Sequence, residues 1–246
     1  MHAPAPPLIP GDLLLLAYRN GIFPMSDSRD DPEVFWVEPR RRAILPLDGF
    51  QLSKSLAKAI RQGRFRITCN TAFDSVISAC AEPRPGHPES WISGRIAESY
   101  RALHDEGHAH SIECWQSGPD GDELVGGLYG VGFGGVFCGE SMFSRRADAS
   151  KVALAWLVGL MRRGGARLLD CQFMTEHLAS LGAIEIAQAR YVALLGEASA
   201  LGEGDGAGSG SAAASLPVAF GALLDEAASA VLPPSKLILQ SLTHTS

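Results

Sequence analysis

The amino-acid sequence predicts an α+β fold of α/β type with a mixed and largely antiparallel sheet. Apolar side chains at helical spacing recur in the first part of the chain, and strand-like segments separated by turn residues follow. A helix, a strand and a short helix come next, an order that favours helices packed on such a sheet. With 246 residues, of which 46% are hydrophobic and 20% charged, the chain is long enough for one large domain or two small ones.

Residues 1–47 are expected to form a small N-terminal subdomain. Asp12 can cap a short helix that contains four consecutive leucines and ends near Gly21. An extended turn follows, because the residue before Pro24 is disfavoured in the helical conformation. Residues 34–37 are expected to form a short strand that leads into a basic turn.

Residues 48–196 are expected to form the main domain. Helices are predicted where capping residues enclose apolar side chains at helical spacing, over residues 53–62, 71–81, 94–106, 150–163 and 176–181. Strands are predicted where apolar runs lie between turn signals, over residues 111–116, 124–133, 135–143 and 166–173. Residues 197–215, rich in Gly, Ala and Ser, predict a flexible segment before a partly apolar C-terminal tail of residues 216–246.

The composition indicates a cytoplasmic protein without a disulfide framework. The five cysteines are odd in number and form no C-x-x-C pair, which favours reduced, buried thiols. No secretion signal opens the chain and four leucines are too few to span a bilayer, so no membrane partner is expected. Because the formal net charge is −6, binding to a nucleic acid would require a local basic patch.

A basic patch of this kind follows the predicted start of the main domain. Its residues are Lys54, Lys58, Arg61, Arg64 and Arg66. The first three recur at helical spacing and share one face of the expected helix, and no acidic residue interrupts the patch. Solvated helix faces usually mix both signs, so contact with phosphates is favoured over a merely solvated face. The three arginines at residues 40–42 can extend the patch.

Polar residues interrupt one face of an apolar strand in the second half of the chain. Because side chains alternate along a strand, Asp170 and Gln172 share a face with Leu168, whereas the intervening residues up to Phe173 point the other way. An unpaired polar group costs about 2–7 kcal/mol to bury, so both residues need partners or a ligand. A strand-end Asp bonded to a neighbouring loop is the alternative. Glu140 likewise places a polar group on an apolar face of its own predicted strand. An exposed acid at the end of that strand is the alternative.

Other signatures of catalysis are weak. His104, His108 and His110 lie near Glu113 and Cys114, but their spacing matches no familiar zinc site, so no metal is expected. The chain has neither a G-x-S-x-G elbow nor the lysine of a P-loop.

Several segments taken together resemble the leucyl/phenylalanyl-tRNA–protein transferase family over residues 13–195. The segments are AYRNGIFP at 17–24, Trp36 to Pro39, Trp91 with Ile92, LHDEGHAHSIE at 103–113, LVGGLYGV at 124–131, FCGESMFSR at 137–145 with Ala149-Ser150-Lys151, LLDCQF at 168–173 and HLASLGAIEI at 177–186. The specific part is FCGESMFS followed by DCQ.

The resemblance implies a GNAT-like acyltransferase domain preceded by the small N-terminal subdomain. It also implies transfer of Leu or Phe, less often Met, from the 3′ end of aminoacyl-tRNA to the α-amine of proteins that begin with Arg or Lys. In bacteria this transfer marks those proteins for N-end rule degradation. No metal or nucleotide cofactor is implied, because an aminoacyl ester is already activated relative to an amide. The basic patch would contact the acceptor stem.

Roles for individual residues follow from the same resemblance. Glu140 would bind the cationic N-terminus of the acceptor protein, and Asp170 with Gln172 would hold and deprotonate the attacking amine. Because an amide has no useful basicity, the proton acceptor would be Asp170 or the departing ribose oxygen. The residues expected to bind the amino acid and the terminal adenine are Trp91, Met142, Phe143, Ser144, Met25 and Trp36.

Two alternatives compete with this hypothesis. An acetyl-CoA-dependent N-acetyltransferase is disfavoured, because the segment before Ser150 lacks an R/Q-x-x-G-x-G/A phosphate loop. A non-catalytic adaptor that binds N-terminal Arg or Lys through Glu140 would leave the basic patch without a purpose. The chain also departs from the family pattern, with Met25 where many relatives have Trp and Ala187-Gln188 where many have Pro-Arg.

Overall fold

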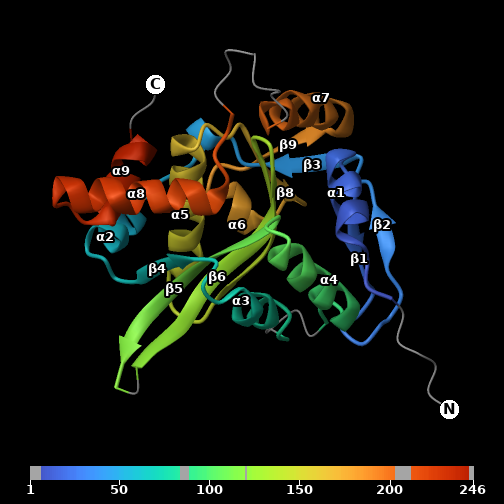
Figure 1. The fold of residues 1–246 in the computed structure, drawn as a ribbon, viewed down its shortest axis with the longest axis horizontal. Coiled ribbons are helices and arrows are strands. Elements are labelled where there is room, and N and C mark those ends of the chain that lie inside the picture. Colours follow the sequence, from blue (N-terminus) through green and yellow to red (C-terminus); the bar gives the residue numbers. More distant parts are fainter. Residues whose placement is uncertain (1–6, 84–88, 120, 203–211, 244–246) are drawn as a thin grey trace.

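A mixed sheet forms the centre of the protein (Figure 1). The computed structural model describes residues 7–83, 89–119, 121–202 and 212–243, and within them seven strands join this sheet in the order β4-β5-β6-β7-β8-β3-β9. The strands are β3 (Arg41–Ile44), β4 (Arg66–Cys69), β5 (Ala109–Gly118), β6 (Gly121–Phe133), β7 (Val136–Ser144), β8 (Leu168–Gln172) and β9 (Ile184–Ala187). Among these described strands, neighbours run antiparallel except β7 and β8, which are parallel because a helical crossover joins them. The predicted mixed α+β fold is confirmed.

Helices cover both faces of the sheet (Figure 1). The helices of one face are α2 (Lys54–Arg61), α5 (Ala149–Arg163), α8 (Leu216–Ala230) and α9 (Pro234–Thr243). The helices of the other face are α1 (Gly11–Arg19), α3 (Phe73–Cys80), α4 (Gly94–Asp105) and α7 (Gln188–Ser199). A short helix, α6 (Glu176–Ala179), follows β8, and 3-10 turns lie at Leu47–Gly49 and Ala200–Gly202. Alternate side chains of the central strands therefore enter two different hydrophobic cores.

Capping side chains mark the starts of α2, α4 and α6, whereas Asp12 lies inside α1 and does not cap it. Before α2, the Ser53 hydroxyl accepts a hydrogen bond from the backbone N–H of Leu56 at 3.2 Å. After α2, Gly63 has a φ of 58°, a conformation that glycine adopts readily. Ser93 and Thr175 cap α4 and α6 in the same way as Ser53. Because these signals are local, the predicted helices of the main domain all appear within a few residues of the expected bounds.

The C-terminal residues expected as a tail contain α8 and α9, which pack in the core against α5. Leu223 of α8 and Ile238 of α9 are completely buried. Gly159 of α5 permits the close approach, because a Cβ at this position would lie 3.0 Å from Ile238 Cδ1. With the sheet on one side and these helices on the other, α5 is apolar around most of its circumference. Of the segment expected to be flexible, residues 197–202 lie at the end of α7 and in the following 3-10 turn, residues 212–215 precede α8, and residues 203–211 lie outside the described residues.

Over the described part of the chain, no single helix has the length and apolar character needed to cross a bilayer. The pair α8 and α9 meets that test only when the two helices are taken together, and they are bent by 112° relative to each other. Their apolar faces pack against α5.

The N-terminal residues form a small sheet and also join the large one. β1 (Phe23–Met25) pairs antiparallel with β2 (Phe35–Val37). The chain then enters the main sheet as β3, which lies between β8 and β9. The expected boundary near residue 47 therefore falls after a strand that belongs to the main sheet.

Candidate active site

A cavity of about 640 Å³ lies where β7 and β8 diverge. The two strands pair only from Val136 opposite Leu168 to Cys138 opposite Asp170, although β7 continues to Ser144. Side chains from both faces of the sheet therefore reach the same space. Of the residues expected to act on a substrate, those that line the cavity are Met25, Trp91, Glu140, Met142, Phe143, Ser144 and Gln172.

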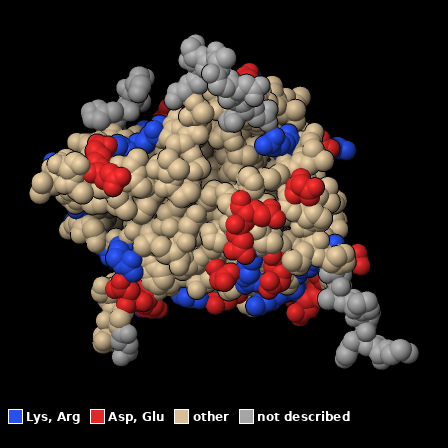
Figure 2. Space-filling view, in the orientation of Figure 1, with Lys and Arg blue, Asp and Glu red and all other residues tan. Residues whose placement is uncertain are grey.

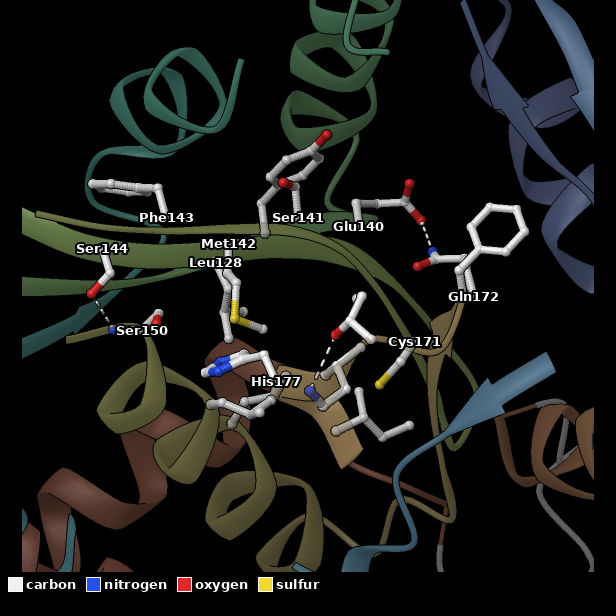
Figure 3. Close-up of a pocket in the computed structure, with 18 of the residues that line it drawn as sticks. Leu128, Glu140, Ser141, Met142, Phe143, Ser144, Ser150, Cys171, Gln172 and His177 are labelled. Atoms are coloured by element: carbon white, nitrogen blue, oxygen red, sulfur yellow. Dashed lines mark hydrogen bonds between the residues drawn. The ribbon is translucent and has the colours of Figure 1, made fainter. Parts of the chain in front are cut away.

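A β-bulge places Glu140 at the mouth of this divergence. Along β6, Tyr129 pairs with Ser141 and the next residue pairs with Gly139, so Glu140 is an extra residue in β7. A bulge shifts every later side chain to the opposite face of the sheet. Met142 therefore points away from Glu140, towards the face covered by α5, as Figure 3 shows. Simple alternation would have placed both side chains on one face.

Glu140 is a buried carboxyl group held by hydrogen bonds. Its Oε1 accepts a bond from Gln172 Nε2 at 2.6 Å, and its Oε2 accepts one from the Tyr100 hydroxyl at 3.2 Å. The hydroxyl of Tyr18 is hydrogen-bonded to that of Tyr100. Burial raises the pKa of Glu140 to about 8, although the hydrogen bond from Tyr18 and the charge of Arg42 act in the opposite direction. Glu140 can therefore change its protonation state near neutral pH.

Gln172 ends β8 in an unusual backbone conformation. Its φ is 53°, in the left-handed region that residues other than glycine enter at a cost of about 1–2 kcal/mol. The Asp170 carboxylate stabilises this conformation by accepting a hydrogen bond from the Gln172 backbone N–H at 2.9 Å. Because the strand ends here, Phe173 departs from the predicted alternation and packs edge-on against Phe23, with ring centroids 5.6 Å apart. The side chain of Gln172 reaches Glu140 across the cavity (Figure 3).

Asp170 is completely buried and is not among the residues that line the cavity. Its Oδ1 accepts hydrogen bonds from Arg42 Nε at 2.8 Å and from the Gln172 backbone. Its Oδ2 accepts from Arg42 Nη2 at 2.6 Å and from the Tyr191 hydroxyl at 3.1 Å. With respect to the described residues, each oxygen thus has two donors. The structure places Asp170 behind Gln172 rather than in contact with a substrate.

Sequence reasoning missed the residues that hold these side chains in place. Arg42, which was expected to extend the basic patch, is completely buried, and Arg41 pairs with Glu185 at the surface. A basic triplet in the sequence does not show that its last member points into a core. Tyr18 and Tyr100 lie at buried positions of amphipathic helices, a spacing that predicts burial but not the partner of a hydroxyl group.

An aromatic wall forms one side of the cavity. Phe23, Met25, Trp91 and Phe173 contribute to it. Trp36, which the resemblance also assigns to the substrate, is absent from the lining: it lies on β2 opposite Pro24 and is 42% exposed. The small sheet therefore brings Met25, but not Trp36, to the cavity.

The part of the cavity on the α5 side is mostly apolar, and its polar lining residues include Ser150, Thr175 and His177. Its apolar residues include Leu128, Met142, Leu154, Leu157, Leu169 and Leu178. The His177 ring lies below β7 among them (Figure 3), and its Nε2 is buried without a hydrogen-bond partner in the described part of the chain. Burial, and then the charge of Lys151, lowers the pKa of His177. The imidazole is therefore a neutral polar group in an apolar wall, and no sequence signal singled it out.

The basic patch divides into free and paired cations. Lys54, Lys58 and Arg61 are exposed on α2 and form no ion pair with any described residue, whereas the opposite side of the helix is buried. Arg64 lies 3.9 Å from Asp148, and Arg66 pairs with Asp122 at 2.8 Å. In Figure 2, acidic side chains interspersed with Lys and Arg lie over α3 and α4, which cover the other face of the sheet. The three free cations therefore lie apart from those acidic side chains.

Two of the residues considered as metal ligands, His110 and Glu113, have other partners. His110 is hydrogen-bonded to Asn70 at 3.0 Å, and Glu113 accepts hydrogen bonds from Thr68 and Ser111. Across the ranges that the structure describes, no group of three His, Cys, Asp or Glu side chains is placed to hold a metal ion.

Comparison with known proteins identifies the family. Residues 44–196 match the family model described as leucyl/phenylalanyl-tRNA protein transferase, and residues 11–40 match the model of its N-terminal domain. The leucyl/phenylalanyl-tRNA–protein transferase of Novosphingobium aromaticivorans is 60% identical over 98% of this chain and 98% of its own length. That of Rhizorhabdus wittichii is 60% identical over 75% of this chain and 73% of its own.

Among solved structures, the crystal structure of FemX has a similar fold, with a TM-score of 0.50 and 12% identity over 72% of this chain and 66% of that chain. At this identity the likeness concerns the fold alone. The family models and the curated relatives agree with the motifs that line the cavity, and together they cover nearly all of the sequence. The chain therefore belongs to the leucyl/phenylalanyl-tRNA–protein transferase family and is an aminoacyltransferase.

Proposed function

We propose that this aminoacyltransferase moves Leu or Phe, less often Met, from aminoacyl-tRNA to the α-amine of proteins that begin with Arg or Lys. The observation that carries the proposal is the joint position of Glu140 and Gln172 at the polar end of a cavity whose other end is apolar. An acid suits a cationic acceptor, and an apolar pocket suits an uncharged amino-acid side chain.

The donor amino acid is proposed to enter the apolar part of the cavity beside Leu128, Met142 and Leu154. Burying a Leu or Phe side chain there contributes about 1.5–3 kcal/mol, whereas a charged side chain would lose its hydration without a partner. The terminal adenosine is proposed to stack on the wall formed by Trp91 and Phe173. Such stacking contributes about 1–3 kcal/mol per base.

The acceptor N-terminus is proposed to bind at Glu140. A bound cation favours the carboxylate form and lowers the pKa of Glu140 from about 8, so the acid ionises as the acceptor enters. The side-chain amide of Gln172 donates to Glu140 through its nitrogen, which leaves its oxygen to orient the attacking amine. The reacting groups are then held together in the polar end of the cavity.

Proton transfer is proposed to end at the departing ribose oxygen. The bound α-ammonium group first gives one proton to the Glu140 carboxylate. The neutral amine nitrogen then forms a bond to the ester carbon, the bond from that carbon to the ribose oxygen breaks, and the ribose oxygen takes the second proton from the nitrogen. Asp170, the other candidate acceptor, has both oxygens occupied by donors and does not line the cavity. We therefore assign Asp170 to the orientation of Gln172.

The remaining proposals concern the setting of the reaction. The acceptor stem of the tRNA is proposed to lie along Lys54, Lys58 and Arg61, whose charges are free to meet phosphates. The sheet is proposed to be GNAT-like, which its antiparallel meander and its helical crossover between two parallel strands support. We also propose a cytoplasmic location and a role in N-end rule degradation, and the reaction needs no cofactor.

A transfer assay tests the proposal. Labelled Leu-tRNA or Phe-tRNA is incubated with a peptide that begins with Arg, beside a peptide that begins with Glu, and acetyl-CoA serves as a control donor. Label is expected only from tRNA and only on the Arg peptide. Acetyl transfer would support an acetyltransferase, and binding of the peptide without transfer would support an adaptor.

The matched variants are Glu140→Gln and Glu113→Gln. Glu113 is also buried, but its carboxylate accepts hydrogen bonds from Thr68 and Ser111, away from the cavity. Loss of the acid that meets a buried cation should lower kcat/KM for the Arg peptide about 30-fold or more, the equivalent of about 2 kcal/mol, in Glu140→Gln only. Equal losses in both variants would contradict the role given to Glu140.

A further inference from the structure

Arg42 is a completely buried cation that reaches neither the cavity nor the solvent. Its guanidinium forms two parallel bonds to Asp170, and its Nη1 donates to the carbonyl oxygen of Gly21 at 3.1 Å. The same group lies over two aromatic rings, 4.6 Å from the ring centre of Phe23 and 4.5 Å from that of Tyr191. One side chain thus connects the residues before β1, the end of β8 and the side of α7.

Stability alone does not explain a charged pair at this position. Removing two charges from water is costly, and buried ion pairs can often be replaced by apolar residues of similar volume without loss of stability. A planar guanidinium does supply what an apolar side chain cannot, a fixed two-point attachment that sets the direction of a carboxylate. The orientation of Asp170 is therefore the property that Arg42 controls.

The orientation of Asp170 reaches Gln172 through one atom. Oδ1 of Asp170 accepts from both Arg42 Nε and the backbone N–H of Gln172. That second bond stabilises the left-handed conformation of Gln172, and this conformation directs the side-chain amide to Glu140. Movement of the Asp170 carboxylate would release the backbone of Gln172 from a conformation that is intrinsically unfavourable.

A second set of contacts leads to the aromatic wall. The Phe23 ring lies against the guanidinium of Arg42 on one side and meets the edge of Phe173 on another. Both rings line the cavity. Arg42 is thus connected by contacts both to the surface proposed to bind the donor nucleoside and to the polar end of the cavity.

We propose that Arg42 is a positioning residue with two separable effects. Through Asp170 it holds Gln172 in the conformation that meets the acceptor amine, and through Phe23 it sets the wall that meets the donor. The inference rests on the proposed function for its kinetic consequences, whereas its structural part concerns the conformation of Gln172 in the free enzyme.

The main test compares Arg42→Lys with Arg162→Lys. Lysine keeps the charge but lacks the two-point attachment, so Arg42→Lys should lower kcat about 10- to 100-fold through misplacement of Gln172. KM for the Arg peptide should stay within about twofold, because Glu140 is retained. Arg162 of α5 also donates to backbone oxygens, of Leu47 and Ser241, at 2.7 Å, but outside the cavity. Arg162→Lys should lower the Tm without lowering kcat.

The second effect has its own variant. Phe23→Leu should raise KM for Leu-tRNA while kcat changes little, because the wall is altered and the polar end is not. The proposal would be overturned if the fall in activity of Arg42→Lys disappeared once activity was expressed per amount of folded protein. An unchanged kcat in Arg42→Lys would overturn it as well.

A readout without substrate separates this inference from the proposed function. The side-chain amide of Gln172, labelled with ¹⁵N, has an NMR signal that its bond to Glu140 displaces from the position of a free amide. That signal should move towards the free position in Arg42→Lys and stay in place in Arg162→Lys. Lack of transfer by the unaltered enzyme would count against the proposed function, whereas an unmoved Gln172 signal in Arg42→Lys would count against the role of Arg42.

Discussion

At the scale of single residues, burial gives ordinary side chains their unusual chemistry. Glu140 is 9% exposed, and this burial raises the pKa of its carboxyl group to about 8, so the group keeps its proton to a higher pH than a glutamate in water does. The raised pKa arises from the fold, because burial outweighs the hydrogen bonds from Tyr18 and Tyr100, which lower the pKa and come from helices far away in the sequence. The ionisation of Glu140 is thus linked to folding as well as to binding.

The free energy of unfolding should depend on pH through Glu140. Its pKa is about 4.5 in the unfolded chain and about 8 in the folded protein, so the folded state binds the proton more tightly. The stability due to Glu140 is therefore fully present below pH 4.5 and is lost as the pH rises through 8. Relative to the unaltered protein, Glu140→Gln should gain at least about 1.4 kcal/mol between pH 5 and pH 8, the equivalent of a tenfold change in the unfolding equilibrium constant. Urea unfolding at several pH values measures this difference, and a constant difference would contradict the raised pKa.

Strand alternation was sufficient to predict that Asp170 and Gln172 lie on one face of a strand. The motif resemblance predicted that Glu140 lies near them. The same reasoning could not distinguish a residue that touches substrate from one behind it. Whether Asp170 faces the cavity depends on Arg42 and Tyr191, which occupy β3 and α7. Such long-range pairing leaves no local pattern in the sequence.

At the scale of elements, the helices expected between residues 53 and 181 were predicted more accurately than the details of the strands, whereas α7, α8 and α9 were not predicted as helices. Caps such as Ser53 act within one turn, so sequence alone locates them. The bulge at Glu140 depends on how β7 pairs with β6, and it determines that Met142 faces the opposite side from Glu140. The predicted strands therefore had the right positions, while the face of their later residues came only from the structure.

The exposed face of α2 gives a prediction about salt. Replacing Lys54, Lys58 and Arg61 by Ala should weaken binding to aminoacyl-tRNA and reduce its dependence on salt. Each lost phosphate contact should lower the slope of log K against log salt by about 0.7–0.9. Arg101→Ala is the control, because Arg101 already bonds Asp74 and Glu98. Fluorescence anisotropy over a range of salt concentrations tests this, and equal slopes for the two variants would remove α2 from the tRNA surface.

At the scale of the whole molecule, the C-terminal helices pack against elements from the middle of the chain. α8 and α9 cover α5, and α9 also packs against α2. Composition identified this region as partly apolar but did not show that it belongs to the core. The α5 helix that it contacts is apolar on all sides, so the sequence of α5 does not indicate which of its faces needs a covering helix. The C-terminal helices thus stabilise the helix that carries the free cations.

Large-to-small substitutions test this support. Ile238→Ala should lower the free energy of unfolding by about 2–5 kcal/mol, because Ile238 is completely buried against Gly159. Val218→Ala in α8 is the control, since Val218 is 61% exposed and should change stability by less than about 1 kcal/mol. Chemical denaturation measures both, and similar small effects would show that α9 is not part of the cooperative core.

The position of β3 has a consequence for any attempt to divide the chain. β3 belongs to the first 47 residues, yet it separates β8 from β9 in the main sheet. A fragment that starts at residue 48 would keep β8 but leave its backbone N–H and C=O groups bare along one side, beside an orphaned β9. Bare edges of this kind recruit strands from other copies, so the shortened chain should form soluble aggregates or precipitate instead of yielding a smaller, independent enzyme.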